Sequence, residues 1–284
     1  MDPQHMTVSS GSAALNVLTW GIDGPVLLAL HPGVGDSRIW NSSAPQWASA
    51  GNRVIAYDRR GFGLTQALPE THDDVSDLLA VLNAINAESA VIVGNSRGGG
   101  LAIDFALANP ERVSALVLIA PSPSGYDYDD WPTATAEAEQ DSLIAAADAA
   151  QDLDLVNRLE TRYWLDGVAQ AEGRVDGPPR ELFTDMNSVA LHASPIGETS
   201  TRPPAWPILS RIEIPVLVAA GEFDLPGIQN QCRELVAALP RAEFVEIPES
   251  AHCPQLDQSD ILARIVLEFL DQPVHDRPVG PPPS

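Results

Sequence analysis

The sequence predicts an α/β fold with a mostly parallel, twisted sheet of about eight strands flanked by helices, and with a helical cap inserted. Two patterns support this prediction. Apolar runs of about five residues recur with helical patterns between them, which is typical of βαβ units. Between residues 121 and 215 this strand rhythm stops, and an acidic, alanine-rich helical pattern replaces it. With 284 residues, 44% of them hydrophobic, the chain can form one large domain with an insertion.

The apolar runs define the expected strands in chain order. These are residues 15–20, 26–30, 53–57, 90–94, 113–120, 215–220 and 243–247. We expect the first two to form an antiparallel hairpin, because a turn-like segment with two glycines and a proline, 21–25, lies between them. Helical patterns predict core helices at 36–50, 72–85, 97–108, 228–238 and 259–270, and cap helices at 133–150, 153–164 and 180–192.

Composition suggests where the domains begin and end. Residues 1–6 contain a second methionine, Met6, directly after a histidine, and we interpret them as a cloning scar before the native start. Residues 272–284 are rich in proline, which predicts a disordered tail. We expect an α/β core at 7–121 and 208–271 and a helical cap at 122–207. The cap should lie over the carboxyl ends of the strands, where ligands bind in open α/β sheets.

Charge and cysteine content exclude several classes of function. The formal net charge of −23 argues against a nucleic-acid partner and against an anionic membrane surface. All sixteen basic residues are arginine, so Schiff-base chemistry and a Walker-type phosphate lysine are excluded. No apolar run reaches the ~18 residues of a membrane span, and no secretory signal is evident, so we expect a cytoplasmic protein. Cys232 and Cys253 are too few for a disulfide framework or a metal cluster, and Cys253 is expected to be a small buried residue.

Residues 94–98, Gly-Asn-Ser-Arg-Gly, are the most informative segment. They follow an apolar run, 90–93, and precede a helical run, which is the strand–turn–helix context of a G-x-S-x-G nucleophile elbow. The sharp turn brings the strand and helix backbones close together, so a Cβ at Gly94 or Gly98 would collide. Ser96 is therefore the candidate nucleophile.

An elbow serine needs a base and an orienting acid, in the chain order Ser, Asp or Glu, His. Asp224 follows the strand at 215–220, and His252 follows the strand at 243–247. Both should emerge at the same edge of the sheet as Ser96. Glu222 is the alternative acid. The remaining histidines fall in the scar, the tail, the cap, the loop after the second strand and the start of the helix at 72–85. His31 is expected to hold its loop, and His72 to cap its helix or face solvent.

The loop after the second strand should complete an oxyanion hole. Pro32 has no N–H, whereas Gly33 can donate one and lets a substrate oxygen come close; Val34 is the alternative donor. The N–H of Arg97, directly after the nucleophile, is the expected first donor.

Five ordered motifs together resemble those of the α/β-hydrolase fold family, in particular its capped esterases, lactonases and C–C hydrolases. They are the His31-Pro32-Gly33 loop with Trp40, the loop at 57–65, the elbow, the acid loop at 221–224 and the histidine loop at His252. Thr65 replaces the usual serine of the D-x-R-G-x-G-x-S loop, and Pro32 replaces a usual glycine. The resemblance covers about residues 12–271 and implies the α/β-hydrolase fold.

This resemblance implies a serine hydrolase that cleaves a small carboxylic ester or lactone through an acyl-enzyme, with catalytic residues Ser96, Asp224 and His252 and with no metal or organic cofactor. Epoxide hydrolases and haloalkane dehalogenases of this fold carry an aspartate at the elbow, so the serine excludes them. A C–C bond hydrolase of a diketone-type substrate remains an alternative, because Asn95 resembles that branch. A cofactor-free perhydrolase or haloperoxidase and a slow-turnover small-molecule receptor are further alternatives.

Three residues are expected to contact the substrate: Arg97, Val34 and Trp131. Relatives often carry Met, Leu, Phe or Gln at the position of Arg97, and a guanidinium there could bind a substrate carboxylate. Alternatively, Arg97 points to solvent or pairs with a cap acid, namely Asp127, Asp129 or Asp130. Other aromatic residues of the cap are expected mostly to pack within it: Tyr126, Tyr128, Trp164 and Trp206.

Overall fold

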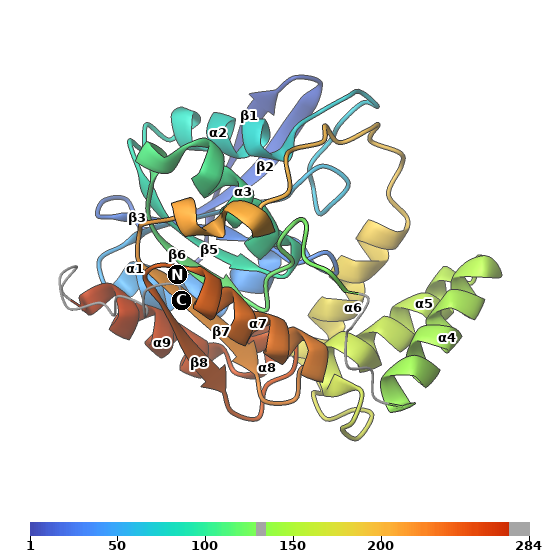
Figure 1. Cartoon of the computed structure of the whole chain (residues 1–284). Helices are drawn as coiled ribbons and strands as arrows, with labels where there is room; N and C mark the ends of the chain where they lie inside the picture. The colour runs from blue at the N-terminus through green and yellow to red at the C-terminus, as the bar shows by residue number, and fades with distance from the viewer. Residues whose placement is uncertain (129–134, 273–284) are drawn as a thin grey trace.

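The computed structural model describes residues 1–128 and 135–272, and these form one eight-stranded sheet (Figure 1). Its spatial order is β1-β2-β4-β3-β5-β6-β7-β8. The strands are β1 (Gln4–Ser10), β2 (Ala13–Trp20), β3 (Val26–Leu30), β4 (Arg53–Tyr57), β5 (Ala90–Asn95), β6 (Val113–Ile119), β7 (Val216–Gly221) and β8 (Ala242–Ile247). β2 runs antiparallel to β1 and β4, and the other neighbours are parallel. The prediction of a mostly parallel sheet of about eight strands is confirmed.

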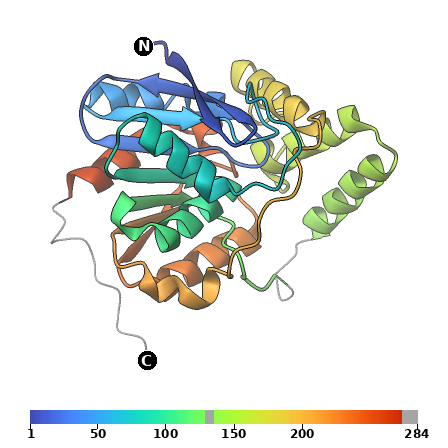
Figure 2. The ribbon, with the colours of Figure 1, turned by 90° about the horizontal axis from the view of Figure 1, so that it is seen from above.

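A helical insertion separates β6 from β7. Figure 2 shows its helices gathered at one end of the sheet. They are α4 (Thr135–Ala149), α5 (Leu153–Glu160), the π-helix η3 (Thr161–Gly167) and α6 (Pro178–Leu191). Contacts identify that end as the carboxyl end of the parallel strands, because Trp164 O accepts a hydrogen bond from His252 N at 3.2 Å and Gly167 lies against the backbone of Phe223. The chain limits of a separate cap domain, 122–207, remain a prediction.

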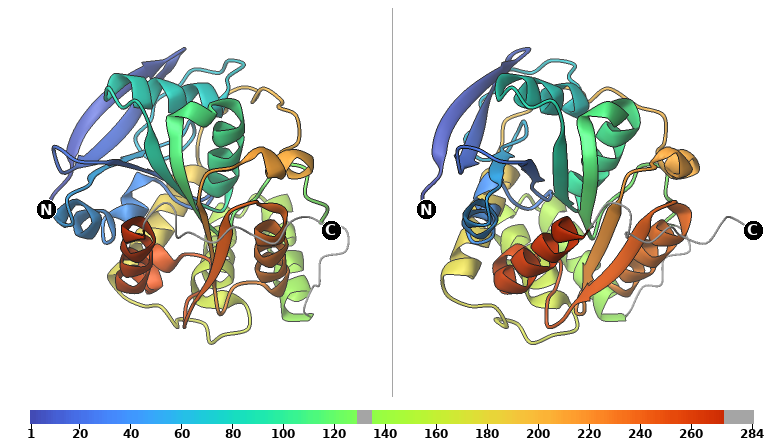
Figure 3. Two further views of the ribbon diagram at one scale, coloured as in Figure 1. Left: turned by 60° about the vertical axis from the view of Figure 1, so that its left-hand side comes forward. Right: turned by 90° about the vertical axis from the view of Figure 1, so that its left-hand side faces the viewer.

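Helices cover both faces of the sheet (Figure 3). On one face lie α2 (Asp74–Ala84), α3 (Arg97–Ala108) and α7 (Pro226–Ala238), and on the other lie α1 (Ala44–Ser49) and α9 (Ser259–Asp271). These helices agree with the predicted ones, except that the pattern at 36–50 divides into two. The remaining short elements are the 3₁₀-helices η1 (Ser37–Trp40), η2 (Pro110–Arg112) and η4 (Trp206–Arg211) and the helix α8 (Pro254–Asp257).

The division at 36–50 has a local cause. Asp36 caps η1 by accepting from the N–H of Arg38 at 2.9 Å. Pro45 then stands in the first turn of α1, where its missing N–H costs nothing but where it cannot continue a preceding helix. Two short helices therefore replace the single predicted one.

The central strand β3 shows how the core is divided. Leu28 and Leu30 pack on the face covered by α2 and α3, whereas Leu27 and Ala29 pack on the opposite face, and all four are fully buried. A strand that is apolar on both faces is typical of a parallel sheet covered by helices on both sides, and β3 pairs parallel with β4 and β5.

The predicted hairpin between β2 and β3 is wrong. β2 pairs with β1 and β4, and β4 lies between β2 and β3. The connecting segment packs against the loop before β4, since a Cβ on Gly24 would overlap the carbonyl oxygen of Gly51. The segment therefore carries the chain past β4 instead of turning it back onto β2.

The first residues of the chain form an edge strand that the apolar pattern did not predict. Gln4 to Met6, interpreted as part of a cloning scar, belong to β1 and pair with residues 17–19 of β2. Val8 is the one buried side chain of this edge strand, which explains why no apolar run revealed it. No helix of the described part of the chain is both long and apolar enough to cross a membrane. Residues 273–284, where we expected a disordered tail, and Trp131 lie outside the described residues.

Candidate active site

Ser96 stands in the sharp turn between β5 and α3. Its backbone has φ +53° and ψ −119°, a conformation that L-residues rarely adopt. The flanking glycines are required by space, because a Cβ on Gly94 would lie 2.5 Å from the Gly98 carbonyl oxygen and one on Gly98 would lie 2.5 Å from that of Leu30. The turn therefore has the geometry of the predicted elbow and presents Ser96 at the carboxyl edge of the sheet.

His252 and Asp224 meet at the same edge. His252 follows β8, Asp224 follows β7, and the His252 Nδ1 and Asp224 Oδ2 atoms are 2.9 Å apart. The second oxygen of Asp224 accepts the Leu225 N–H at 2.8 Å, and both side chains of the pair are buried. Because the carboxylate accepts at Nδ1, the Nε2 atom of the ring is left to accept a proton. Glu222, the alternative acid, instead accepts the Glu249 N–H at 2.9 Å.

The side chain of Asn95 joins the elbow to the histidine loop. Its amide nitrogen donates to the carbonyl oxygen of Ile119 at 3.0 Å and to that of His252 at 3.2 Å. The N–H of Ser96 itself bonds to the same Ile119 oxygen at 2.9 Å. The residue before the candidate nucleophile therefore fixes the backbone of the candidate base.

Trp164, from the π-helix of the insertion, lies against the imidazole of His252. The two ring centroids are 4.6 Å apart, with planes inclined by 45°. The sequence suggested only that this aromatic residue packs within the cap. No local pattern predicts the contact, because it depends on the fold of the insertion. By contrast, Tyr126 and Trp206 contact each other, with centroids 4.6 Å apart.

The loop after β3 lies at a switch point of the sheet, since β4 and β5 flank β3 on opposite sides. His31 in this loop is fully buried, and its Nε2 accepts the Arg59 N–H at 3.1 Å. Its Nδ1 therefore carries the proton and donates to the Pro32 carbonyl oxygen at 2.7 Å. Burial, followed by the nearby Arg59 guanidinium, lowers the pKa of His31 well below its usual value and keeps the ring neutral. His31 thus holds the loop, as expected.

Gly33 lies directly under the side chain of Arg97. A Cβ on Gly33 would come within 2.8 Å of Arg97 Cδ, so the loop approaches the first turn of α3 closely. Backbone N–H groups in the first turn of a helix have no acceptor within that helix, and the N–H of Arg97 is one of them. Val34, the alternative donor, packs against the core beneath α1 and α9.

The loop at 57–65 supports the site structurally. The carboxylate of Asp58 accepts the backbone N–H groups of Ser37 and Leu64, each at 2.8 Å. The hydroxyl of Thr65 donates to the Asp58 carbonyl oxygen at 2.6 Å and accepts the Asn16 N–H at 2.9 Å. Threonine therefore supplies the hydroxyl that the serine of the usual motif would supply.

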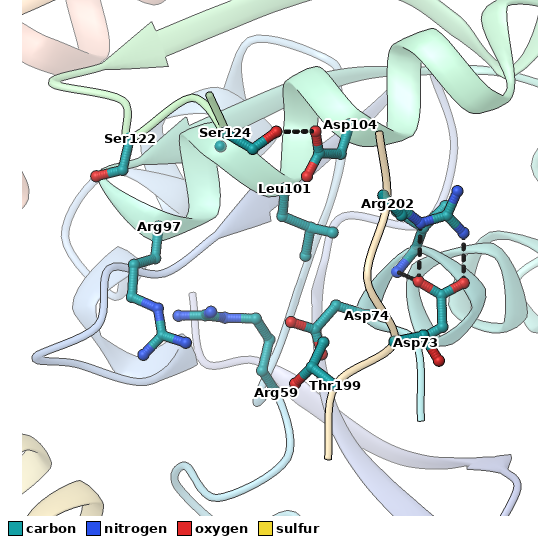
Figure 4. A pocket seen from close by; sticks show the side chains of 13 residues that line it. Arg59, Asp73, Asp74, Arg97, Leu101, Asp104, Ser122, Ser124, Thr199 and Arg202 are labelled. Carbon is teal, nitrogen blue, oxygen red and sulfur yellow. Dashed lines mark hydrogen bonds and ion pairs between the residues drawn. The ribbon is translucent and has the colours of Figure 1, made fainter. Parts of the chain in front are cut away.

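A cavity of about 220 Å³ opens beside the elbow (Figure 4). At one end the guanidinium groups of Arg59 and Arg97 point toward each other. At the other end Arg202 forms an ion pair with Asp73. The cavity is also lined by residues of α2, α3 and the segments after β6 and before η4: Asp74, Val75, Gly100, Leu101, Asp104, Ser122, Ser124, Thr199 and Ser200. The inward position of Arg59 was missed by the sequence analysis, where the only signal was two adjacent arginines after a buried strand.

Several other expectations concern residues that do not line this cavity. His72 is buried and precedes α2, whose cap is Asp73, so the expected exposed or capping role of His72 is wrong. The reason is its pairing with the segment before η4, where its carbonyl oxygen accepts the Ser200 N–H at 2.7 Å. Cys232 and Cys253 are free and buried, and burial raises the pKa of both thiols. Among the described residues, no cluster of three or more His, Cys, Asp or Glu could hold a metal ion.

A strained serine between a strand and a helix, on this sheet order, is the architecture of an α/β hydrolase. A family model described as the alpha/beta hydrolase fold matches residues 25–259, and the chain belongs to that family. The chain is 27% identical over 266 residues to the pimeloyl-[acyl-carrier protein] methyl ester esterase of Chromobacterium violaceum, covering 93% of this chain and 96% of that protein. It is 26% identical over 259 residues to the 2-hydroxy-6-oxononadienedioate/2-hydroxy-6-oxononatrienedioate hydrolase of Comamonas testosteroni, covering 87% and 88%.

The comparison with solved structures agrees on the fold. The bromoperoxidase from Bacillus anthracis superposes with a TM-score of 0.77 at 22% identity, covering 95% of this chain and 100% of that chain. At this identity the likeness concerns the fold and not the reaction.

Proposed function

We propose that this chain is a serine hydrolase that cleaves a small carboxylic ester or lactone, with Ser96 as nucleophile, His252 as base and Asp224 as orienting acid. The observation that carries the proposal is the 2.9 Å bond between His252 and Asp224 beside a serine held at φ +53°. Such a backbone conformation costs roughly 1–3 kcal/mol and persists where the surroundings impose it, which is frequent at active sites. The similarity to a methyl ester esterase supports the choice of an ester.

The proposed reaction uses these three groups in turn. As Ser96 Oγ attacks the carbonyl carbon, His252 Nε2 accepts its proton, and the Asp224 carboxylate stabilises the imidazolium that forms. The N–H groups of Gly33 and Arg97 hold the oxyanion, and one such donor typically stabilises the transition state by about 3–4 kcal/mol. His252 then protonates the leaving group. In the second half, it activates the water that hydrolyses the acyl-enzyme.

A C–C bond hydrolase is the second candidate. The printed name of the relative from Comamonas testosteroni is that of a hydrolase of an oxo-dienedioate, and the facing arginines beside the elbow suit an acidic substrate. Asn95 no longer supports this candidate by itself, because its side chain has a structural role here as the link between the elbow and the histidine loop. The triad would be the same in both reactions.

Steady-state hydrolysis of p-nitrophenyl esters from acetate to decanoate tests the proposal. We expect multiple turnover in the wild type, loss of that turnover in Ser96→Ala, and unchanged turnover in Ser114→Ala, which removes an exposed serine of β6. Labelling of Ser96 by a serine-reactive phosphonate without ester turnover would favour the C–C hydrolase or the receptor. Absence of labelling in folded protein would overturn the triad.

A further inference from the structure

Arg59 and Arg97 reach the cavity from different elements. Arg59 follows β4 and Arg97 begins α3, yet their guanidinium groups point toward each other at one end of the cavity (Figure 4). Two like charges at close range repel, and a protein normally separates them or places a carboxylate between them. The placement of two facing guanidinium groups in one cavity therefore indicates a site for a negatively charged group.

Arg59 is a buried cation with unused donor capacity. Its residue is 4% exposed, and its Nη2 donates to the carbonyl oxygens of His31 and Pro32 at 3.1 and 3.0 Å. Its Nε, in contrast, is buried with no hydrogen-bond partner among the described residues. The Cζ atom of Arg59 lies over the ring of Phe62, 4.8 Å from the ring centroid. Burial and the neighbouring charge of Arg97 lower the pKa of Arg59 to about 10, which still leaves it charged at neutral pH.

The described carboxylates that line the cavity, Asp73, Asp74 and Asp104, form no ion pair with Arg59 or Arg97. Asp73 is paired with Arg202, and Asp104 accepts from the hydroxyl of Ser124 at 3.1 Å. Asp74 is the acid that acts on Arg59 from a distance. Neither Arg59 nor Arg97 forms an ion pair within 4.0 Å with any other described residue. The alternative pairing of Arg97 with Asp127 is therefore not formed, and Asp129 and Asp130 lie outside the described residues.

We propose that Arg59 and Arg97 form a subsite that binds a carboxylate of the substrate, so that the enzyme acts on substrates bearing a free acid near the scissile carbonyl. A carboxylate between the two groups would accept from those guanidinium nitrogens of Arg59 and Arg97 that face the cavity and would offset the repulsion between the two charges. Its position beside the elbow rests on the proposed function, because the side chain of Arg97 covers Gly33 of the proposed oxyanion hole. The subsite thus assigns the substrate class: half-esters of dicarboxylic acids, or their lactone or diketo-acid counterparts.

Matched substrates isolate the charge of the acid. Monomethyl succinate, glutarate and adipate are compared with the methyl esters of the corresponding monoamides, which have nearly the same size and no charge. The ratio of kcat/KM for acid over amide is measured for the wild type, Arg97→Gln, Arg97→Lys and the control Arg233→Gln, whose side chain is exposed on α7. Glutarate binding is measured separately by titration calorimetry.

We expect the wild type and Arg233→Gln to prefer the acid by roughly 10- to 100-fold, the range of a charge-assisted hydrogen bond. Arg97→Gln should bring the ratio close to one, with Arg97→Lys between, and should abolish glutarate binding. A wild-type ratio near one, or an undiminished ratio in Arg97→Gln, would overturn the subsite. Glutarate binding that depends on Arg97 without ester hydrolysis would retain the subsite and refute the proposed ester hydrolysis.

Discussion

Replacing Asp224 with asparagine tests the candidate triad, because the hydrogen bonds around it determine which way the new amide points. One oxygen of Asp224 accepts the Leu225 N–H at 2.8 Å, and the other faces His252 Nδ1 at 2.9 Å. In asparagine only the carbonyl oxygen can accept the Leu225 N–H, so the NH₂ group must face His252. It then donates to Nδ1, and the ring proton moves to Nε2. In that tautomer His252 cannot accept the proton of Ser96.

The expected loss in kcat is about 10⁴-fold, or about 5.5 kcal/mol in the transition state, which is the typical effect of the wrong tautomer in a Ser-His-Asp triad. The fold should be preserved, because the two side chains have almost the same shape and the Leu225 bond is retained. The matched control is Glu222→Gln on the same loop, whose carboxylate bonds to the backbone of Glu249 and not to His252.

The assay is ester hydrolysis at saturating substrate, with thermal unfolding of each variant measured in the same buffer. We expect Glu222→Gln to keep its kcat within about twofold and Asp224→Asn to retain its melting temperature. An Asp224→Asn enzyme with more than a tenth of the wild-type kcat would refute the reasoning. So would an equal loss in Glu222→Gln.

Two further predictions concern stability. Asp77→Ala removes two hydrogen bonds, of 2.7 and 3.1 Å, from the guanidinium of Arg60, whose side chain is 2% exposed. This substitution should lower the free energy of unfolding, measured by urea denaturation, by about 3–5 kcal/mol. Glu70→Gln should lower it by less, because the Glu70 side chain is 32% exposed, and equal losses in the two variants would contradict this reasoning. Below pH 6.5 His31 becomes protonated in the unfolded chain but stays neutral in the folded chain, so the free energy of unfolding should fall by up to about 1.4 kcal/mol per pH unit. In His31→Gln, the free energy of unfolding should fall less steeply with pH between pH 6.5 and 5. An unchanged pH dependence in this variant would contradict the lowered pKa of His31.

The parts of the fold that the sequence predicts are those with strong local signals. β7 is apolar along its whole length, β5 is apolar up to its last residue, Asn95, and both strands are buried on both faces, so the apolar runs and the turn residues revealed them. β1 carries one buried side chain, Val8, and no local signal distinguishes such an edge strand from a loop. The pairing partner of β2 was wrong because strand order depends on contacts between distant segments.

The same distinction applies to the candidate site. Ser96, Asp224 and His252 each follow an apolar run that predicts a strand. Because parallel strands end at a common edge of the sheet, these runs were enough to predict that the three residues lie close together. The inward position of Arg59 and the contact of Trp164 with His252 depend on how a loop and a π-helix fold over that edge. No periodicity encodes such positions.

The contact between Trp164 and His252 couples the position of the π-helix η3 to the position of the candidate base. Trp164 provides both a ring against the imidazole and the carbonyl oxygen that accepts the His252 N–H. Any outward movement of η3 must therefore also release the histidine from one of its restraints. Exchanging this insertion for that of another hydrolase would therefore also alter the surroundings of His252, the candidate base.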